Sequence, residues 1–156
     1  MKLRAENLVK TYKKRSVVKG ISVEVNQGEI VGLLGPNGAG KTTTMKILTC
    51  FLTQSSGSAS VCGFDVEKDP IKVKQSIGYL PEGNPLYKDM YIKEYLHFVG
   101  SVFKVPNLAK RVDQMIEQTG LTPERNKLIG QLSKGYKQRV GLAQALIHDP
   151  EVLILD

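Results

Sequence analysis

Hydrophobic and polar positions alternate incompletely over residues 3–10 and again over 17–25, and Val, Leu and Ile dominate both stretches. This two-residue period predicts two strands, joined by the basic turn at 10–15. Shorter apolar stretches, bounded by Gly, Pro or polar residues, predict further strands at 29–34, 56–61, 77–80 and 151–155.

The spacing of apolar residues changes to three or four elsewhere, which predicts helices over 42–52, 91–103, 108–119 and 135–148. In the first, Met45, Leu48 and Leu52 are expected to share an inward face. The aromatic stripe of 91–103 is interpreted as core packing, and Gly120 as a helix C-cap. Strands therefore come first, a helical block is inserted, and a strand returns, which is typical of an α/β fold.

Residues 35–42 read Gly-Pro-Asn-Gly-Ala-Gly-Lys-Thr and match G-x-x-x-x-G-K-[ST], the P-loop or Walker A pattern, between a predicted strand and a predicted helix. Glycines allow the backbone to curl so that successive N–H groups form an anion-binding nest. The start of the following helix adds its dipole. Lys41 is predicted to reach the β- and γ-phosphates of a nucleoside triphosphate, and the Thr42 hydroxyl to hold Mg²⁺.

The stretch 152–156, Val-Leu-Ile-Leu-Asp, is a hydrophobic strand that ends in a carboxylate, the Walker B pattern. Many strands end in aspartate, so this pattern indicates a metal-binding residue only in a chain that also has a P-loop earlier in its sequence. In that context Asp156 is predicted to face the loop and to hold Mg²⁺ through water.

Between these motifs lies Leu132-Ser133-Lys134-Gly135-Tyr136-Lys137-Gln138-Arg139. Ser133 is a favourable N-cap, and the helix that follows directs the positive end of its dipole outward. With all three motifs in this order, the chain resembles the ATP-binding subunits of ABC transporters, whose signature is LSGGQ. The exact signature residues resemble the branch associated with ABC-2-type exporters.

The resemblance implies a P-loop NTPase core with an N-terminal antiparallel strand region and an inserted helical subdomain. It divides one incomplete ATP-binding domain, 1–156, into 1–86 with the P-loop core, 87–148 with the helical subdomain and signature, and 149–156 with the Walker B strand. ATP and Mg²⁺ are the implied cofactors. The residues implied to contact ATP are Tyr12, which stacks on adenine, Gly35, Pro36, Asn37, Gly38, Ala39, Gly40, Lys41, Thr42, Thr43, Ser133 and Gly135. Lys41, Glu82 and Asp156 are implied to be catalytic, and Thr42, Glu82 and Asp156 to contact the metal.

The chain departs from the family pattern in several places. Glu82 stands where the family has the Q-loop glutamine, and Lys134 and Tyr136 replace Gly and Gln of the signature. The family's catalytic glutamate and switch histidine follow the Walker B aspartate and lie outside 1–156; His97 and His148 are interpreted as structural or solvated residues. The family's next strand lies between the Walker A and Walker B strands. We therefore expect 1–156 alone to be marginally folded and not to hydrolyse ATP.

The resemblance implies a subunit that binds and hydrolyses ATP to energise a membrane transporter. Its implied partners are a second ATP-binding subunit, which forms a dimer with each P-loop opposite the partner's signature, and transmembrane permease subunits. Two alternatives stay open: an inactive truncated nucleotide-binding fragment, and an ABC-type ATPase that acts on ribosomes or DNA. Residues 53–131 show no sustained heptads, which argues against the coiled-coil DNA-repair members.

Composition narrows the picture further. The formal net charge is +7, but the basic residues are scattered apart from 10–15, so we expect a solvated surface and no nucleic-acid partner. Cys50 and Cys62 are too few for a disulfide framework. No apolar run is long enough to cross a bilayer, which favours a cytoplasmic location. The resemblance implies that the subunit is peripheral at the cytoplasmic face of the membrane.

Overall fold

The structure is a computed structural model that describes residues 1–156, and it divides into two compact units, Met1–Ile77 and Gly78–Asp156. Each unit has its own core and is described by itself. The α/β fold class expected from the sequence is confirmed, because each unit combines helices with strands. No helix in either unit combines the length and apolar character that a membrane span requires.

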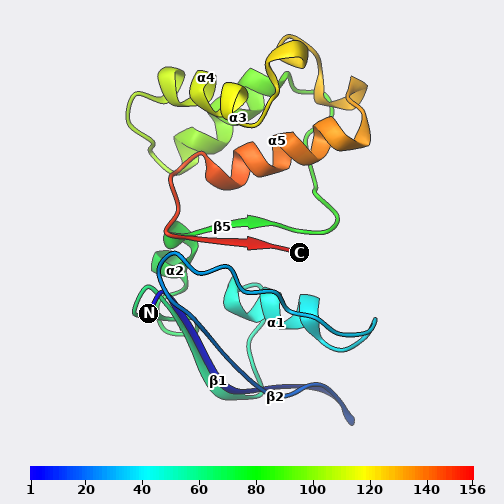
Figure 1. Cartoon of the computed structure of the whole chain (residues 1–156), viewed down its shortest axis with the longest axis vertical. Helices are drawn as coiled ribbons and strands as arrows, with labels where there is room; N and C mark the ends of the chain where they lie inside the picture. The colour runs from blue at the N-terminus through cyan, green and yellow to red at the C-terminus, as the bar shows by residue number, and fades with distance from the viewer. The chain divides into compact units, whose positions relative to one another are not determined.

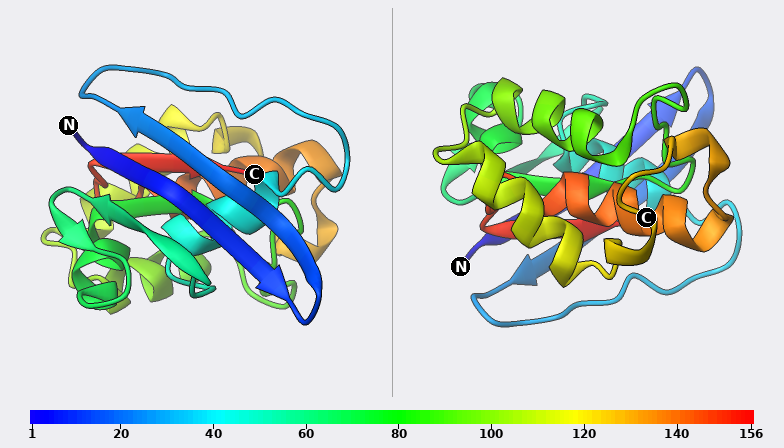
Figure 2. Two further views of the ribbon diagram at one scale, coloured as in Figure 1. Left: turned by 90° about the horizontal axis from the view of Figure 1, so that it is seen from below. Right: turned by 90° about the horizontal axis from the view of Figure 1, so that it is seen from above.

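The first unit is built on a four-stranded sheet with the order β2-β1-β3-β4. Strands β1 (Leu3–Tyr12) and β2 (Arg15–Val25) form a long antiparallel pair, and β3 (Ser56–Val61) lies along the other edge of β1 (Figures 1 and 2). The short β4 (Phe64–Asp65) pairs with β3. The antiparallel strands predicted from the alternation are confirmed. One face of the sheet is buried because alternate side chains point to the same side.

Two helices accompany this sheet: α1 (Lys41–Leu48) and α2 (Pro70–Ser76), the second of which the sequence reasoning missed. Helix α1 contacts β1, β2 and β3 and buries Ile47 and Leu48. It ends four residues earlier than predicted, because Thr49 forms the C-cap and Cys50 adopts a left-handed φ of 59°. The core of this unit comprises Leu3, Ala5, Leu8, Val18, Ile47, Leu48, Ala59, Val61, Val66 and Val73.

The strand predicted at 29–34 is absent, and this is the main correction to the sequence-based fold. The segment between β2 and α1 runs as an extended loop away from the paired strands (Figure 2, left view). Ile30 and Leu34 are almost fully exposed. A strand requires a neighbour to accept its hydrogen bonds, and neither sheet of the structure includes this segment. Hydrophobicity alone therefore did not make it a strand.

The second unit places three helices on a two-stranded sheet. Strands β5 (Ile77–Leu80) and β6 (Val152–Leu155) are neighbours and run in the same direction (Figure 1). Helix α5 (Lys134–Leu146) lies between these strands and the pair α3 (Ile92–Val102) and α4 (Leu108–Gln118) (Figure 1). Two short 3₁₀ turns, Thr122–Glu124 and Ile129–Gln131, connect α4 to α5.

The helical core explains why these segments are helices. Within α3 and α4 buried residues lie three or four positions apart, as at Ile92, Tyr95 and Leu96 and at Val112, Met115 and Ile116. The rest of the core comprises Leu121, Ile129, Leu132, Val140, Ala143 and Ile147. Thr119 is the C-cap of α4, one residue before the predicted Gly120, which follows it in the left-handed conformation at φ 68°. The aromatic stripe of α3 is only partly core. Tyr91 and Phe98 are exposed, because the face of α3 that meets α4 and α5 runs through Ile92 and Leu96.

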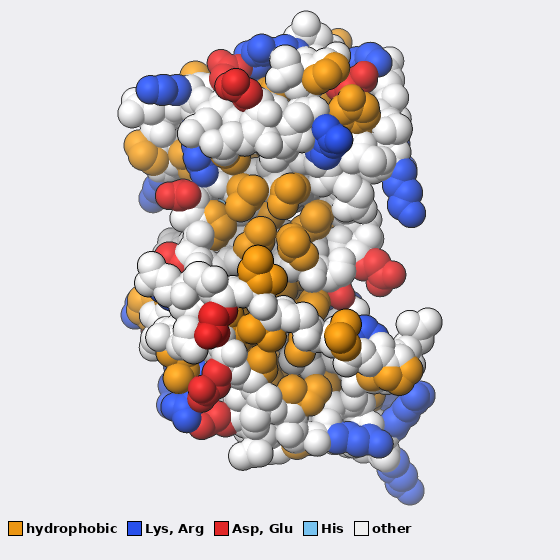
Figure 3. All heavy atoms as spheres, in the orientation of Figure 1, with side chains coloured by type: hydrophobic (Ala, Val, Ile, Leu, Met, Phe, Trp, Pro, Cys, Tyr) orange, Lys and Arg blue, Asp and Glu red, His pale blue; other side chains and the backbone are white.

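Charged side chains are distributed over the surface. Figure 3 shows Lys and Arg side chains spread over the visible face, with Asp and Glu side chains among them. This is the distribution expected of a solvated surface. The exception is a group of basic residues at the turn between β1 and β2, which has a place in the site described next.

Candidate functional site

The P-loop turn in the first unit depends on Gly40, which forms the N-cap of α1 at φ 91°. A Cβ at this position would lie 2.6 Å from the carbonyl oxygen of Val17 and 3.2 Å from Cγ2 of Val18. Both the left-handed conformation and the close approach to β2 therefore require glycine. This contact fixes where α1 begins relative to the sheet.

Lys41 and Thr42 occupy the first turn of α1, whose amides have no acceptors within the helix. The Lys41 ammonium donates hydrogen bonds to the carbonyl oxygens of Gly35, at 2.7 Å, and Pro36, at 2.9 Å. The positive charge is thus held over the loop, beside the positive end of the helix dipole. The backbone amides of the helix start, the helix dipole and an ammonium in one place fit a phosphate group.

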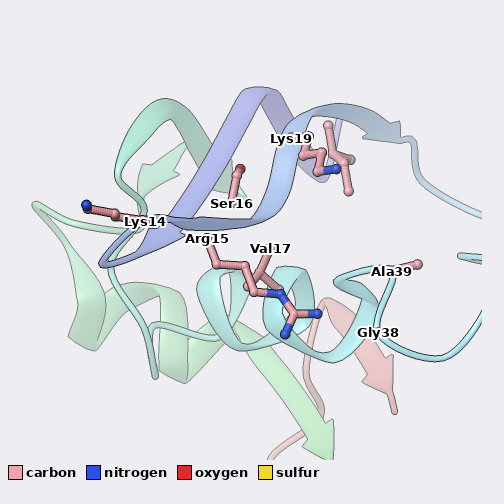
Figure 4. Close-up of a pocket in the computed structure, with 8 residues that line it drawn as sticks. Lys14, Arg15, Ser16, Val17, Lys19, Gly38 and Ala39 are labelled. Atoms are coloured by element: carbon pink, nitrogen blue, oxygen red, sulfur yellow. The ribbon is translucent and has the colours of Figure 1, made fainter.

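A groove of about 640 Å³ runs from the loop along β2 (Figure 4). Residues 15, 17, 19 and 21 of β2 point to one side because side chains alternate along a strand. The lining residues are Lys14, Arg15, Ser16, Val17, Lys19, Ile21, Gly38 and Ala39. Three of them carry positive charge, so the groove suits an anionic ligand that extends beyond the P-loop.

The sequence reasoning noticed the basic turn but assigned it to a solvated surface. The pattern that could have identified these groove residues is the two-residue period of β2, which places Arg15 and Lys19 on one face of the strand. What the sequence does not contain is the proximity of that face to Gly38 and Ala39, which depends on the packing of α1.

Tyr12, predicted to stack on adenine, is the last residue of β1, and its ring is about half exposed. The Lys10 ammonium lies 5.3 Å from the centroid of this ring and donates a hydrogen bond to the carbonyl oxygen of Thr53. The groove along β2 is lined by other residues. The stacking role of Tyr12 therefore stays a prediction.

In the second unit, Asp156 and Glu82 follow the carboxyl ends of the neighbouring strands β6 and β5. The Asp156 amide donates to the carbonyl oxygen of Leu80 at 3.0 Å, which places both acidic residues at one end of the pair. Glu82 is exposed. In open parallel sheets this end is where ligands bind.

Tyr79 is a residue of this site that the sequence reasoning took only as part of a strand. Its hydroxyl donates a hydrogen bond to Oδ2 of Asp156 at 3.4 Å. Burial, and then the nearby Asp156 carboxylate, raises the pKa of Tyr79. The hydroxyl therefore stays protonated and can donate to the carboxylate.

The signature segment begins α5 as predicted. Ser133 is the N-cap, and its Oγ accepts a hydrogen bond from the amide of Tyr136 at 3.3 Å. Ser133 and Gly135 are exposed, and the nearest atom to a Cβ at Gly135 would be Ser133 Oγ at 4.0 Å. The Arg139 guanidinium lies over the Tyr136 ring and donates to the carbonyl oxygen of Gly120 at 3.1 Å. The start of α5 is thus held by hydrogen bonds of Ser133 and Arg139, while Ser133 and Gly135 remain exposed to solvent.

The predicted metal contacts come from both units: Thr42 from the first, Glu82 and Asp156 from the second. A hydroxyl and two carboxylates are the oxygen donors that Mg²⁺ prefers, so the residue types fit the ion. Within the second unit, Glu82 and Asp156 lie at one strand end, as such a site requires. Their convergence with Thr42 stays a prediction.

The two histidines have the structural and solvated surroundings that the sequence analysis expected. The His148 ring stacks on Phe103 with centroids 3.9 Å apart and planes 8° from parallel. His97 is exposed on α3.

Comparison with known proteins agrees with this geometry. The family model of the ABC transporter matches residues 18–156. The linearmycin resistance ATP-binding protein LnrL of Bacillus subtilis (strain 168) is 40% identical over 99% of the chain and 50% of its own length. The lipopolysaccharide export system ATP-binding protein LptB of Haemophilus influenzae (strain ATCC 51907 / DSM 11121 / KW20 / Rd) is 38% identical over 99% of the chain and 66% of its own length.

Solved structures agree as well. The ATP-binding subunit of an ABC transporter matches 100% of the chain and 66% of its own, with a TM-score of 0.90 and 26% identity. The cbiO1 protein of Clostridium perfringens matches 99% of the chain and 64% of its own, with a TM-score of 0.86 and 31% identity.

The fold and the P-loop define a P-loop NTPase of the ABC type. The chain belongs to the ABC transporter family. It spans about half the length of several curated relatives that it matches.

Proposed function

We propose that this chain is the nucleotide-binding part of an ABC transporter subunit that binds and hydrolyses ATP to energise transport. The observation that carries the proposal is the P-loop of the first unit. Position 40 has room only for glycine. The Lys41 ammonium is held over the loop by hydrogen bonds to the carbonyl oxygens of Gly35 and Pro36. The basic groove along β2 supports an anionic ligand that continues from this loop.

In this proposal each residue has a specific task. The Lys41 ammonium leaves the loop carbonyls and binds the β- and γ-phosphates, while amides at the start of α1 bind phosphate oxygens. Thr42, Glu82 and Asp156 hold Mg²⁺ directly or through water. The bound ion supplies charge neutralisation between the phosphates. The exposed first turn of α5, with Ser133 and Gly135, binds the γ-phosphate held by a second subunit.

The partners follow from the same proposal. ATP joins two such subunits face to face, and the subunits dock on transmembrane permease subunits at the cytoplasmic side of the membrane. Several relatives support this assignment by their names, among them LptB, which belongs to an export system, and LnrL, a resistance protein. The solved cbiO1 protein is part of the transporter complex cbiONQ. An export direction fits the ABC-2-type signature of residues 132–139.

The test is nucleotide binding by the full-length protein with Lys41→Ala. We expect Mg-ATP binding, measured by calorimetry, to be lost while circular dichroism shows an intact fold. The matched control is Lys46→Ala, an exposed lysine in the last turn of the same helix, which should bind normally. Unchanged affinity in Lys41→Ala would rule out the P-loop assignment.

A further inference from the structure

Asn84 connects the loop after β5 to the helix that begins at the signature. Its Nδ2 donates a hydrogen bond to the carbonyl oxygen of Lys137 at 2.7 Å. Lys137 lies in the first turn of α5, and its own amide donates to Ser133, the N-cap. Asn84 also closes its own loop, because its amide donates to Pro81 at 3.0 Å. One side chain therefore joins the loop of Glu82 to the first turn of α5.

This connection is costly. Asn84 adopts a left-handed φ of 36°, and its Oδ1 is buried without a hydrogen-bond partner. Buried acceptors without partners are rare because desolvation is not compensated. A left-handed φ is common for asparagine, so the buried Oδ1 without a partner is the cost that points to a role for this contact.

Helix α5 has a glycine, Gly141, where the Asn84 side chain packs against it. A Cβ at Gly141 would lie 2.4 Å from Oδ1 of Asn84 and 2.6 Å from Cδ1 of Leu80. Only a residue without a side chain allows the loop and the end of β5 to approach α5 so closely. Two features therefore allow the loop to lie close to α5: the side-chain amide of Asn84 bonds to the helix, and Gly141 has no side chain in the way.

We propose that Asn84 is a positioning residue that ties the loop carrying Glu82 to α5, so that Glu82 and the signature turn move as one piece. The inference rests on the proposed function for what Glu82 does, but the tie itself does not depend on it. In this proposal Asn84 acts through Glu82, two residues earlier, and not on the nucleotide or the metal itself.

The tie is tested first without nucleotide, by hydrogen exchange on the full-length protein. Asn84→Gly removes the side-chain amide and relieves the left-handed backbone, so the fold should survive. We expect amides of 82–86 to exchange roughly fivefold faster, the loss of about one hydrogen bond. The control is Asn107→Gly, an exposed asparagine with φ 49° whose side chain makes no capping bond. It should leave 82–86 unchanged.

Gly141→Ala tests the same tie from the helix side. The added methyl group should displace Asn84 and speed exchange in 82–86 although the asparagine is still present. If neither Asn84→Gly nor Gly141→Ala speeds exchange there more than Asn107→Gly does, the tie is refuted.

The positioning role is tested by a double-mutant cycle on Mg-ATP affinity with Glu82→Ala, which removes the side chain on which Asn84 is proposed to act. We expect Asn84→Gly to weaken Mg-ATP binding roughly five- to tenfold in the unchanged background and to have no further effect when Glu82 is already Ala. Equal losses in both backgrounds, or no loss in either, would refute action through Glu82. Failure of the proposed function is recognised separately, since Lys41→Ala would then bind Mg-ATP normally while the exchange result stands by itself.

Discussion

The hydroxyl of Tyr79 donates a hydrogen bond to Oδ2 of Asp156 at 3.4 Å, between the neighbouring strands β5 and β6. A hydrogen bond to one carboxylate oxygen restricts the rotation of the carboxylate. Tyr79 thus lies behind the acidic residue that the Walker B pattern assigns to Mg²⁺.

Tyr79→Phe should weaken Mg-ATP binding about threefold to fivefold, because a long hydrogen bond contributes at most about 1 kcal/mol. Metal-free ATP should bind with unchanged affinity. Calorimetry with Mg²⁺ and with EDTA separates the two. Tyr87→Phe is the control, since that ring packs on Tyr95 and Phe98 instead. Equal loss with and without metal would contradict a role in orienting Asp156.

Gly40→Ala should destabilise the protein by about 2–4 kcal/mol, because left-handed strain adds to the contact with the carbonyl oxygen of Val17. Gly38→Ala is the control: φ is 81°, but a Cβ there meets no atom within 4 Å, so only strain remains. Denaturant unfolding followed by circular dichroism should rank Gly40→Ala well below Gly38→Ala. Equal stability of the two variants would show that the contact with β2 is unimportant.

Gly135→Asp should abolish ATP-driven dimerisation while ATP binding to the monomer stays normal. The added carboxylate would face the γ-phosphate of the nucleotide held by the second subunit. Gly135→Ala is the neutral control, because the position is open and a methyl group fits. Sedimentation with ATP measures dimerisation. A loss of monomer binding with dimerisation retained would show that the signature does not act across the dimer.

Tyr95 should make the protein less stable at alkaline pH. Burial, followed by the nearby Tyr87, raises the pKa of Tyr95 to about 12, above an ordinary value of about 10. Between these values the unfolded chain loses a proton that the folded protein keeps, so the free energy of unfolding falls as pH rises. After allowance for solvent screening, we expect a fall of about 1–2 kcal/mol. In Tyr95→Phe, denaturant titrations from about pH 9 to 12 should show a smaller fall; an identical pH dependence would contradict it.

The sequence by itself determined the order and type of most elements and the local geometry of their ends. The alternation over 3–10 and 17–25 predicts β1 and β2, because a half-buried strand needs that period. Ser133 as an N-cap and Gly120, the left-handed residue directly after the C-cap Thr119, are local too: each helps to satisfy backbone groups of its own helix.

Tertiary structure decided whatever depends on a partner distant in the sequence. Residues 29–34 have the composition of a strand, but in this structure no neighbouring strand accepts their hydrogen bonds. The basic groove exists because α1 packs against β2, which brings Gly38 to the side of Arg15 and Lys19. Tyr79 meets Asp156, and Asn84 meets Lys137, across 77 and 53 residues of chain. Such contacts follow from packing, which no local pattern encodes.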